Sequence, residues 1–338
     1  MTKPEPIDLR SDTVTRPDQQ MSAAMATAEV GDDVLDHDPT MRALEERVAH
    51  LLGMPAALWV PSGTMGNLIA LCLHLGRGQR FLAPRGAHVL THELGSAAWL
   101  AGGMPDPLPW DAGPGRPAPE TVRANVEAEA PYDSLRTTLL CLENTHNEAG
   151  GAVVPPDEHA KLVSAARDAG LRVHLDGARI WNAAVALEVP PAALTAGVDS
   201  VQACLSKGLG APVGSVVAGS TDFIAEARRM RKMLGGGVRQ GGVLAAAGLV
   251  ALDRIDSLAE DHRKAARLAG GLAELGWKVT TPQTNMVLAE AADVRATVDR
   301  LAGVGVLAVP MGDRIRFVTH RDVSEADVER ALQRIAEF

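Results

Sequence analysis

A single lysine lies in a run of small residues where a reactive amine could meet a cofactor. Lys207 stands in the stretch CLSKGLGAPVGS, which spans residues 204–215. A lysine in a desolvated pocket loses stabilisation of its charged form, so its amine can form a Schiff base with a carbonyl group. The neighbouring glycines would let the backbone and a cofactor approach closely. An isolated Ser-Lys-Gly tripeptide is more typical of a flexible surface loop, so the rest of the sequence must decide.

The other lysines of the chain offer weaker candidates for a reactive amine. Lys3 lies in a proline-rich segment, Lys161 and Lys264 lie among charged residues of helical pattern, and Lys278 lies near the start of a strand-like segment. We interpret these four as solvated surface residues, and Lys207 stands out among the six lysines of the chain.

A carboxylate and a guanidinium follow a strand-like segment in the stretch LRVHLDGARIWNA, residues 171–183. Strand ends in parallel sheets commonly present functional groups, so Asp176 could face a bound ligand. If that ligand is pyridoxal 5′-phosphate, Asp176 would keep its ring nitrogen protonated and so maintain the ring as an electron sink. Arg179 could bind an amino-acid carboxylate through two hydrogen bonds, or it could form a structural ion pair with Asp176.

An anion site is predicted in the stretch WVPSGTMGN, residues 59–67, which has the pattern of a strand, a tight turn and a helix. The first N–H groups of a helix and its dipole favour an anion such as a phosphate. Gly63 and Thr64 would donate to it, with Ser62 in support. The same turn is also typical of an ordinary helix N-cap, so the motif counts only in combination with the others.

Composition restricts the classes of partner. The chain has 338 residues, of which 46% are hydrophobic and 22% charged, and a net charge of −9, which is typical of a globular protein and argues against nucleic acid as a partner. It contains no apolar run of the roughly 20 residues that span a bilayer. The stretch MTKPEPIDLR at its start lacks the apolar core of a signal peptide. We therefore expect a small-molecule substrate, no membrane contact and a cytoplasmic location.

The cysteines, one histidine pair and the glycine-rich stretches argue against a disulfide framework, a metal site and a dinucleotide site. The chain has three widely spaced cysteines in apolar segments, which predicts neither a disulfide framework nor a cysteine metal site. His88, His92 and Glu93 lack the HExxH order because the glutamate lies outside the histidine pair, so we predict no metal. The glycine-rich stretches lack the spacing and context of a dinucleotide loop.

The elements that must position these residues alternate between short apolar strands and longer helical segments, which predicts an α/β fold with a mostly parallel sheet. Strands are expected at 57–60, 137–142, 172–175 and 213–218, and helices at 65–75 and 156–169. A long helical region, 243–275, precedes a smaller α+β unit with strands at 278–280, 286–288 and 315–318 and a helix at 325–338. We place the boundary near residue 246, which gives domains 1–245 and 246–338.

An ordered set of motifs over nearly the whole chain resembles the low-specificity L-threonine aldolases, in the β-eliminating lyase group of fold-type I pyridoxal-phosphate enzymes. The matching stretches are DLRSDTVTRP (8–17), GDDV (31–34), DPT (38–40), SGTMGN (62–67), GAH (86–88), LENTHN (142–147), HLDGARIWNA (174–183), CLSKGLGAPVGS (204–215), RKMLGGGVRQGG (231–242), TNM (284–286) and VTH (318–320). The resemblance implies a large domain with a seven-stranded, mostly parallel sheet, a small C-terminal domain and pyridoxal 5′-phosphate as cofactor. It implies reversible cleavage of L-threonine, L-allo-threonine and related β-hydroxy-α-amino acids, including those of phenylserine type, to glycine and an aldehyde.

The resemblance also implies roles for individual residues. Lys207 would attach the cofactor, Asp176 would meet its ring nitrogen, Ser62, Gly63 and Thr64 would hold its phosphate, and His88 would stack on its ring. Ser11, Arg179 and Arg316 would hold the substrate carboxylate. His88 and His146 are both candidates for acid–base chemistry at the β-hydroxyl group. Arg239, like Lys232, flanks a glycine-rich turn that would reach the phosphate region of a neighbouring subunit in a homo-oligomer, or would be a solvated basic loop.

Three alternatives remain open from the sequence. Where the family often has GDDVYGDDPT, this chain has Leu35, Asp36 and His37 before Asp38, which either alters the substrate side-chain pocket or changes only a loop. A related lyase could use the same Lys207 and Asp176 for β-elimination from another amino acid. A catalytically silent cofactor-binding protein could keep the same fold.

Overall fold

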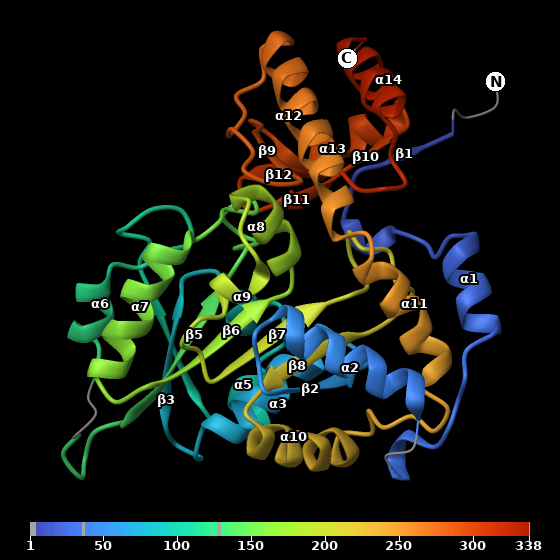
Figure 1. Cartoon of the computed structure of the whole chain (residues 1–338). Helices are drawn as coiled ribbons and strands as arrows, with labels where there is room; N and C mark the ends of the chain where they lie inside the picture. The colour runs from blue at the N-terminus through green and yellow to red at the C-terminus, as the bar shows by residue number, and fades with distance from the viewer. Residues whose placement is uncertain (1–4, 36–37, 127–129, 338) are drawn as a thin grey trace.

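The protein, described here by a computed structural model over residues 5–35, 38–126 and 130–337, is built around one large sheet (Figure 1). Within these residues, seven strands lie in the order β2-β8-β7-β6-β5-β3-β4, and all of their pairings are parallel except those of β8. The strands are β2 (Ala56–Val60), β3 (Arg80–Pro84), β4 (Met104–Leu108), β5 (Thr137–Glu143), β6 (Arg172–Gly177), β7 (Ser200–Cys204) and β8 (Ser215–Gly219). The predicted mostly parallel sheet is confirmed.

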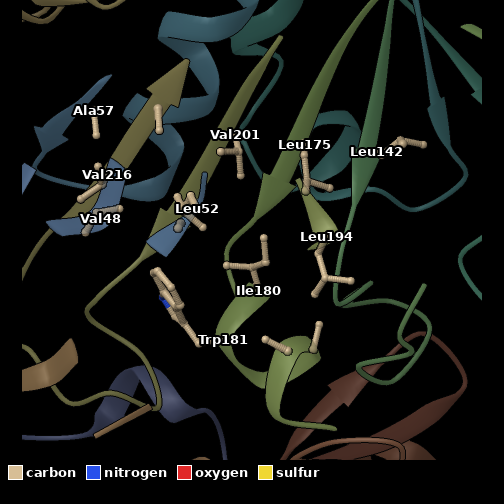
Figure 2. Close-up of a cluster of buried hydrophobic side chains, with 14 of the residues drawn as sticks. Val48, Leu52, Ala57, Leu142, Leu175, Ile180, Trp181, Leu194, Val201 and Val216 are labelled. Carbon is tan, nitrogen blue, oxygen red and sulfur yellow. The ribbon is translucent and has the colours of Figure 1, made fainter. Parts of the chain in front are cut away.

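Helices cover both faces of this sheet, as the burial of alternate strand residues requires. On β2, Ala57 and Trp59 join the largest buried cluster, whereas Leu58 and Val60 face a second cluster on the other side. The first face is covered by α2 (Pro39–Leu51), α7 (Pro156–Asp168), α8 (Ile180–Leu187), α9 (Pro191–Leu194) and α11 (Gly242–Leu252). Figure 2 shows part of this cluster between strands and helices. The opposite face is covered by α3 (Gly63–His74), α4 (His88–Thr91), α5 (Ser96–Trp99) and α10 (Thr221–Met233).

A separate buried cluster fills the C-terminal part of the chain, at the top of Figure 1. Here α12 (Leu258–Glu274), α13 (Val294–Gly303) and α14 (Glu325–Ala336) pack beside the antiparallel strands β9 (Met286–Glu290), β12 (Arg314–Val318) and β11 (Val309–Met311). A Cβ atom at Gly271 would lie 2.3 Å from Leu332, so glycine lets α12 and α14 approach closely. The N-terminal strand β1 (Ile7–Asp8) joins this unit by pairing with β10 (Val306–Leu307).

The remaining elements are short connections. They are the single-turn helices η1 (Asp12–Val14), η2 (Asp33–Leu35) and η3 (Ile255–Ser257), together with α1 (Gln19–Ala26) and α6 (Pro119–Ala124).

The structure favours a different position for the domain boundary from the one predicted near residue 246. The predicted long helical region over 243–275 consists of α11, η3 and α12. Residue 246 lies inside α11, which packs with α1 and α2 in the large-domain cluster, whereas the small-domain cluster includes Ala265 and later residues of α12. The two-domain division stays a prediction, and the buried clusters favour a changeover in α12 rather than at residue 246.

Two local expectations are wrong for identifiable reasons. Residues 278–280 form no strand; Val279 makes an isolated bridge to Ala289. Lys264 is buried, because its ammonium group donates to the carbonyl oxygens of His320 and Val323 and pairs with Asp261 at 2.7 Å. Among the described residues, no helix is long and apolar enough to cross a membrane.

Candidate active site

A cavity of about 310 Å³ lies at the carboxyl ends of β6 and β7, beside the start of α3. Its lining brings together six of the predicted site residues, namely Ser62, Gly63, Thr64, His88, Asp176 and Lys207. These residues come from four separated stretches of sequence, and the parallel arrangement of the strands brings them to one edge. The volume is near the lower end of the roughly 300–1,000 Å³ that is usual for small-molecule sites.

The start of α3 forms one wall of the cavity. Ser62 caps this helix, since its hydroxyl accepts from the N–H of Met65 at 3.2 Å. Gly63 and Thr64 follow in the first turn, whose N–H groups have no partner within the helix. A Cβ atom at Gly63 would lie 3.0 Å from Cys204 Sγ and from the side-chain nitrogen of Gln202, so only glycine lets the turn approach β7 so closely. The helix cap is observed, and the anion site stays a prediction that the remaining N–H groups of this turn allow.

Several donors hold the carboxylate of Asp176. Its Oδ1 accepts from the backbone N–H of Ala178 at 3.0 Å, and its Oδ2 accepts from Asn67 Nδ2 at 2.8 Å. The Gln202 amide satisfies its neighbours when its nitrogen faces Asp176 Oδ1, at 3.1 Å, and its oxygen faces the N–H of Ala203. Because Asp176 and Gln202 are register partners on β6 and β7, the sheet itself places them side by side.

His88 is oriented by a second carboxylate. Its Nδ1 lies 2.9 Å from Glu93 Oε1, and its backbone N–H donates to Glu143 Oε2 at 2.7 Å. Burial by itself would lower the pKa of His88, but the hydrogen bond to Glu93 and the charges of Asp176 and Glu93 outweigh it and raise that pKa. Since Glu93 accepts a hydrogen bond from the Nδ1–H of His88, the other ring nitrogen, Nε2, is free to accept a proton.

These residues fit the predicted pyridoxal 5′-phosphate. The start of α3, where the first N–H groups of the helix favour an anion, lines the same cavity as the lysine and the carboxylate that the cofactor requires. Ligand atoms of His88, Glu93 and Asp176 also lie within 4.8 Å of one another, a spacing that a cation could use. In the described structure these atoms already bond to one another or to Asn67, and the expected absence of a metal stays a prediction.

Arg179 has a partner that the sequence did not indicate. Its Nε and Nη2 each donate to Asp12 at 2.7 Å in a buried two-point ion pair, so the structural partner of Arg179 is Asp12 and not Asp176. Asn285 adds a donor to Asp12 at 3.2 Å. Burial by itself would raise the pKa of Asp12, but Arg179, Lys207 and Asn285 hold it well below its usual range. The charge of Lys207 is therefore close enough to act on both Asp12 and His88.

We expect Asp12→Asn to destabilise the folded protein by about 3–5 kcal/mol near neutral pH, because Arg179 would remain as a buried charge without its partner. The folded-state pKa of Asp12 is lowered, so its stabilisation is present above its ordinary value of 3.8 and is lost as the pH falls through the folded value. Urea unfolding followed by circular dichroism should therefore show a lower free energy of unfolding for Asp12→Asn than for wild type. This difference should shrink as the pH falls below 3.8. The exposed Asp313 provides the control, Asp313→Asn. Equal stability of Asp12→Asn and wild type at neutral pH would contradict the assignment.

Arg316 lies on β12 and is short of hydrogen-bond partners. It donates from Nη1 to Asn147 Oδ1 and from Nη2 to the carbonyl of Arg10, each at 3.0 Å. Within the described structure its buried Nε has no partner. Burial and the nearby charge of Arg179 lower the pKa of Arg316 to about 10. Two desolvated arginines close together favour an anion, and Ser11 lies beside them, next to Asp12, at the cap of η1.

Five predicted site residues lie outside the lining of this cavity. Ser11, Arg179 and Arg316 form the adjoining group just described. His146 is fully buried, its ring packs edge-on against Trp110, and its Nδ1 accepts from the N–H of Ala149. Its Nε2 is buried without a partner among the described residues. Arg239 is exposed and pairs with Asp32 at 3.1 Å, so it does not reach the cavity of its own chain.

Several residues around the site were not identified from the sequence. Asn67, Glu93, Gln202 and Asp12 hold the predicted residues in place, although each occurs in or beside a motif. The available signal was periodicity: Asn67 follows Gly63 by one helical turn, and Gln202 precedes Cys204 on the same strand face. Leu35 is exposed, whereas Asp36 and His37 lie outside the described residues, so their effect on the pocket stays a prediction.

Comparisons with known proteins agree with this arrangement. The family described as beta-eliminating lyase matches residues 8–294. A probable low-specificity L-threonine aldolase 2 of Arabidopsis thaliana is 44% identical over 340 residues, which covers 96% of this chain and 95% of that protein. A low specificity L-threonine aldolase of Escherichia coli K12 is 43% identical over 324 residues, covering 94% and 95%. A solved threonine aldolase of Leishmania major superposes with a TM-score of 0.84 at 20% identity, covering 98% of this chain and 99% of that one.

Proposed function

The chain belongs to the β-eliminating lyase family, and from this membership we propose that it is a pyridoxal-phosphate-dependent lyase that cleaves L-threonine and L-allo-threonine to glycine and acetaldehyde. Related β-hydroxy-α-amino acids, including those of phenylserine type, would release the corresponding aldehyde, and the reverse reaction would join glycine to an aldehyde. The observation that carries the proposal is the single cavity lined by Lys207, Asp176, His88 and the Gly63–Thr64 turn.

The residues of this cavity divide the work of holding the cofactor. Lys207 would hold it covalently, the start of α3 would hold its phosphate, and His88 would lie against its ring. When bound with its ring nitrogen protonated, pyridoxal 5′-phosphate accepts the electron pair that is left on Cα when the Cα–Cβ bond breaks. Asp176, which has its own donors in Ala178, Asn67 and Gln202, supplies the negative charge that keeps that nitrogen protonated.

Arg316 and Arg179 would hold the substrate carboxylate, with Ser11 beside them. The unpartnered Nε of Arg316 and the closeness of the two guanidinium groups support this role. Asp12 would keep Arg179 in position rather than exclude the substrate, because it uses the Nε and Nη2 atoms and leaves Nη1. A fixed carboxylate orients the Cα–Cβ bond relative to the cofactor.

His88 would take the proton of the β-hydroxyl group as the aldehyde forms. It lines the cavity with Lys207, and its Nε2 can accept a proton because Nδ1 is engaged by Glu93. His146 remains a second candidate, since its Nε2 is unpartnered among the described atoms, but its burial against Trp110 favours a supporting position.

Product analysis tests the proposed reaction directly. Incubation of the holoenzyme with L-threonine or L-allo-threonine should yield glycine and acetaldehyde in equal amounts. A β-eliminating lyase acting on amino acids such as serine would instead produce pyruvate and ammonia. From L-threonine or L-allo-threonine the same elimination would give 2-oxobutyrate and ammonia. Formation of only these products, or no product with cofactor bound, would contradict the aldolase assignment.

We expect Glu93→Gln to move the acidic limb of the kcat/KM profile to lower pH. The raised pKa of His88 depends on Glu93, and without that charge the opposing effect of burial gains weight and the pKa falls. Because His88 must be neutral to accept a proton, the active form then persists to lower pH. Glu148, which lies 3.8 Å from His92, provides a matched control as Glu148→Gln. An acidic limb at the same pH in Glu93→Gln and wild type would argue against His88 as the base.

A homo-oligomer, either a dimer or a homotetramer built as a dimer of dimers, would complete the site. Arg239 lies outside the cavity of its own chain, and we propose that it reaches the cofactor phosphate of a neighbouring copy, as the resemblance implies. The exposed apolar side chains of Leu94, Trp99 and Met233 support the presence of an interface. We place the enzyme in the cytoplasm, with a small-molecule amino acid as its partner and neither nucleic acid nor membrane.

A further inference from the structure

A row of polar side chains runs from the cavity, at the carboxyl ends of β6 and β7, to the amino ends of the same two strands. Its members come from helix α3 and the two strands, and all except the exposed Arg172 are buried. In order they are Asn67, His174, Ser200 and His74, with Arg172 at the outer end. None of these residues was assigned a role from the sequence, and the mechanism above uses only the contact between Asn67 and Asp176.

The periodicity of the elements explains why these side chains meet. His174 and Asp176 are two residues apart on β6, so they share a face of the sheet, and Ser200 is the register partner of His174 on β7. Asn67 and His74 are seven residues apart on α3, which is about two helical turns, so both point to that same face. The row therefore follows from regular structure rather than from an irregular loop.

The hydrogen-bonding capacity of each group gives the row a single direction. Asn67 Nδ2 donates to Glu93 Oε1 at 2.7 Å and to Asp176 Oδ2 at 2.8 Å, which uses both of its hydrogens. Asn67 Oδ1 can only accept, so His174 Nε2, 3.1 Å away, must carry the hydrogen. The remaining nitrogen of a neutral His174 then accepts at Nδ1.

The same reasoning continues to the outer end. His174 Nδ1 accepts from the hydroxyl of Ser200 at 2.8 Å, so Ser200 in turn accepts from His74 Nε2 at 2.7 Å. His74 Nδ1 then accepts from Arg172 Nη1 at 3.4 Å. Both histidines must be neutral for this pattern, and burial lowers the pKa of His174 to about 4 and that of His74 to about 3. Every bond therefore points from Arg172 toward Asp176.

We propose that Asn67, His174, Ser200 and His74 are positioning residues that form a one-way hydrogen-bond relay, which fixes the amide of Asn67 so that Asp176 and Glu93 always face its donors. The proposal rests on the proposed function, in which Asp176 meets the cofactor ring nitrogen. Loss of the Ser200 hydroxyl would leave His174 Nδ1 without a donor and make the other tautomer competitive. His174 Nε2 would then face Asn67 Oδ1 without a hydrogen, and the amide would turn its oxygen toward two carboxylates.

Ser200→Ala is the sharpest test because it removes one buried hydroxyl that does not line the cavity. The readout is the ¹⁵N signal of holoenzyme containing pyridoxal 5′-phosphate labelled at the ring nitrogen, which reports protonation of that atom. We expect Ser200→Ala and His174→Leu to shift the signal toward the unprotonated position, with kcat about tenfold or more lower. His174→Gln, whose amide nitrogen can still donate to Asn67, should restore most of the signal even if His174→Leu folds poorly.

Thr195→Val supplies the matched control, since the buried Thr195 hydroxyl donates to Leu52 O outside the row, and this variant should leave the signal unchanged. Wild-type signals in both Ser200→Ala and His174→Leu would overturn the relay. Asp176→Asn separates the two proposals: if it also leaves the ring signal unchanged, the assigned role of Asp176 fails. In that case the relay is tested by the ¹⁵N signals of wild-type protein labelled at histidine. His174 should carry its hydrogen on Nε2, and a hydrogen on Nδ1 instead would refute the relay.

Discussion

Lys207→Ala should cleave L-threonine roughly 10⁴-fold more slowly than the wild-type enzyme. The substitution removes the amine that holds the cofactor and returns to it after each turnover, and alanine offers no replacement nucleophile. Reduction of the wild-type holoenzyme with borohydride, digestion and mass spectrometry should show a pyridoxyl adduct on the peptide that contains residue 207. The same treatment of Lys207→Ala should show no adduct there.

The exposed Lys161 supplies the control for this experiment, since it pairs with Glu158 on the surface of α7 and lies outside the lining of the cavity. Lys161→Ala should keep both the adduct and the rate. Should the adduct in the wild-type protein occur at another lysine, the assignment of the whole cavity would have to be abandoned, because Asp176, His88 and the start of α3 are placed around Lys207.

Arg316→Leu should lower kcat/KM for L-threonine by about 10²- to 10³-fold, most of it through KM. Removing one partner of a buried charge-assisted hydrogen bond typically costs about 2–5 kcal/mol, and each 1.4 kcal/mol corresponds to a factor of ten. Steady-state kinetics with threoninamide, which lacks the carboxylate, sharpen the test. Wild type and Arg316→Leu should cleave this analogue at similar, low rates.

Arg314 is a suitable control because it lies two residues away on β12 and donates to the carbonyl of Glu148. Arg314→Leu should change kcat/KM little. Arg316→Lys should give an intermediate loss, since lysine keeps the charge but not the two-point geometry. A loss in Arg316→Leu that is equally large for threonine and threoninamide would show that Arg316 supports the fold rather than binding the carboxylate.

The sequence predicted the parts of the site that are carried by local patterns. The alternation of strands and helices predicted the mostly parallel sheet, and the ends of β2 and β6 correctly located Ser62 to Thr64 and Asp176 at one edge. Lys207 was indicated by its glycine-rich surroundings and its place after an apolar strand. Each of these signals lies within about ten residues of the chain.

Contacts between distant segments could not be predicted in this way. The partner of Arg179 is Asp12, 167 positions earlier, and Asn67 bonds to Asp176 across 109 positions. Lys264 resembled a surface residue because its neighbours on α12 are charged, although the loop after β12 covers it with carbonyl oxygens. Partners of this kind depend on how the elements pack, which a single sequence does not specify.

The pairing of β1 with β10 has a consequence for the order in which the enzyme matures. Asp12 is held between Arg179 and Asn285, and Arg316 donates to the carbonyl of Arg10, so the first part of the chain is completed by the last. A ribosome exposes the lysine-bearing loop well before β12 has been made. A nascent chain can therefore possess its nucleophile while it still lacks the arginine that would bind the amino-acid carboxylate, and catalysis has to await the synthesis and folding of β12.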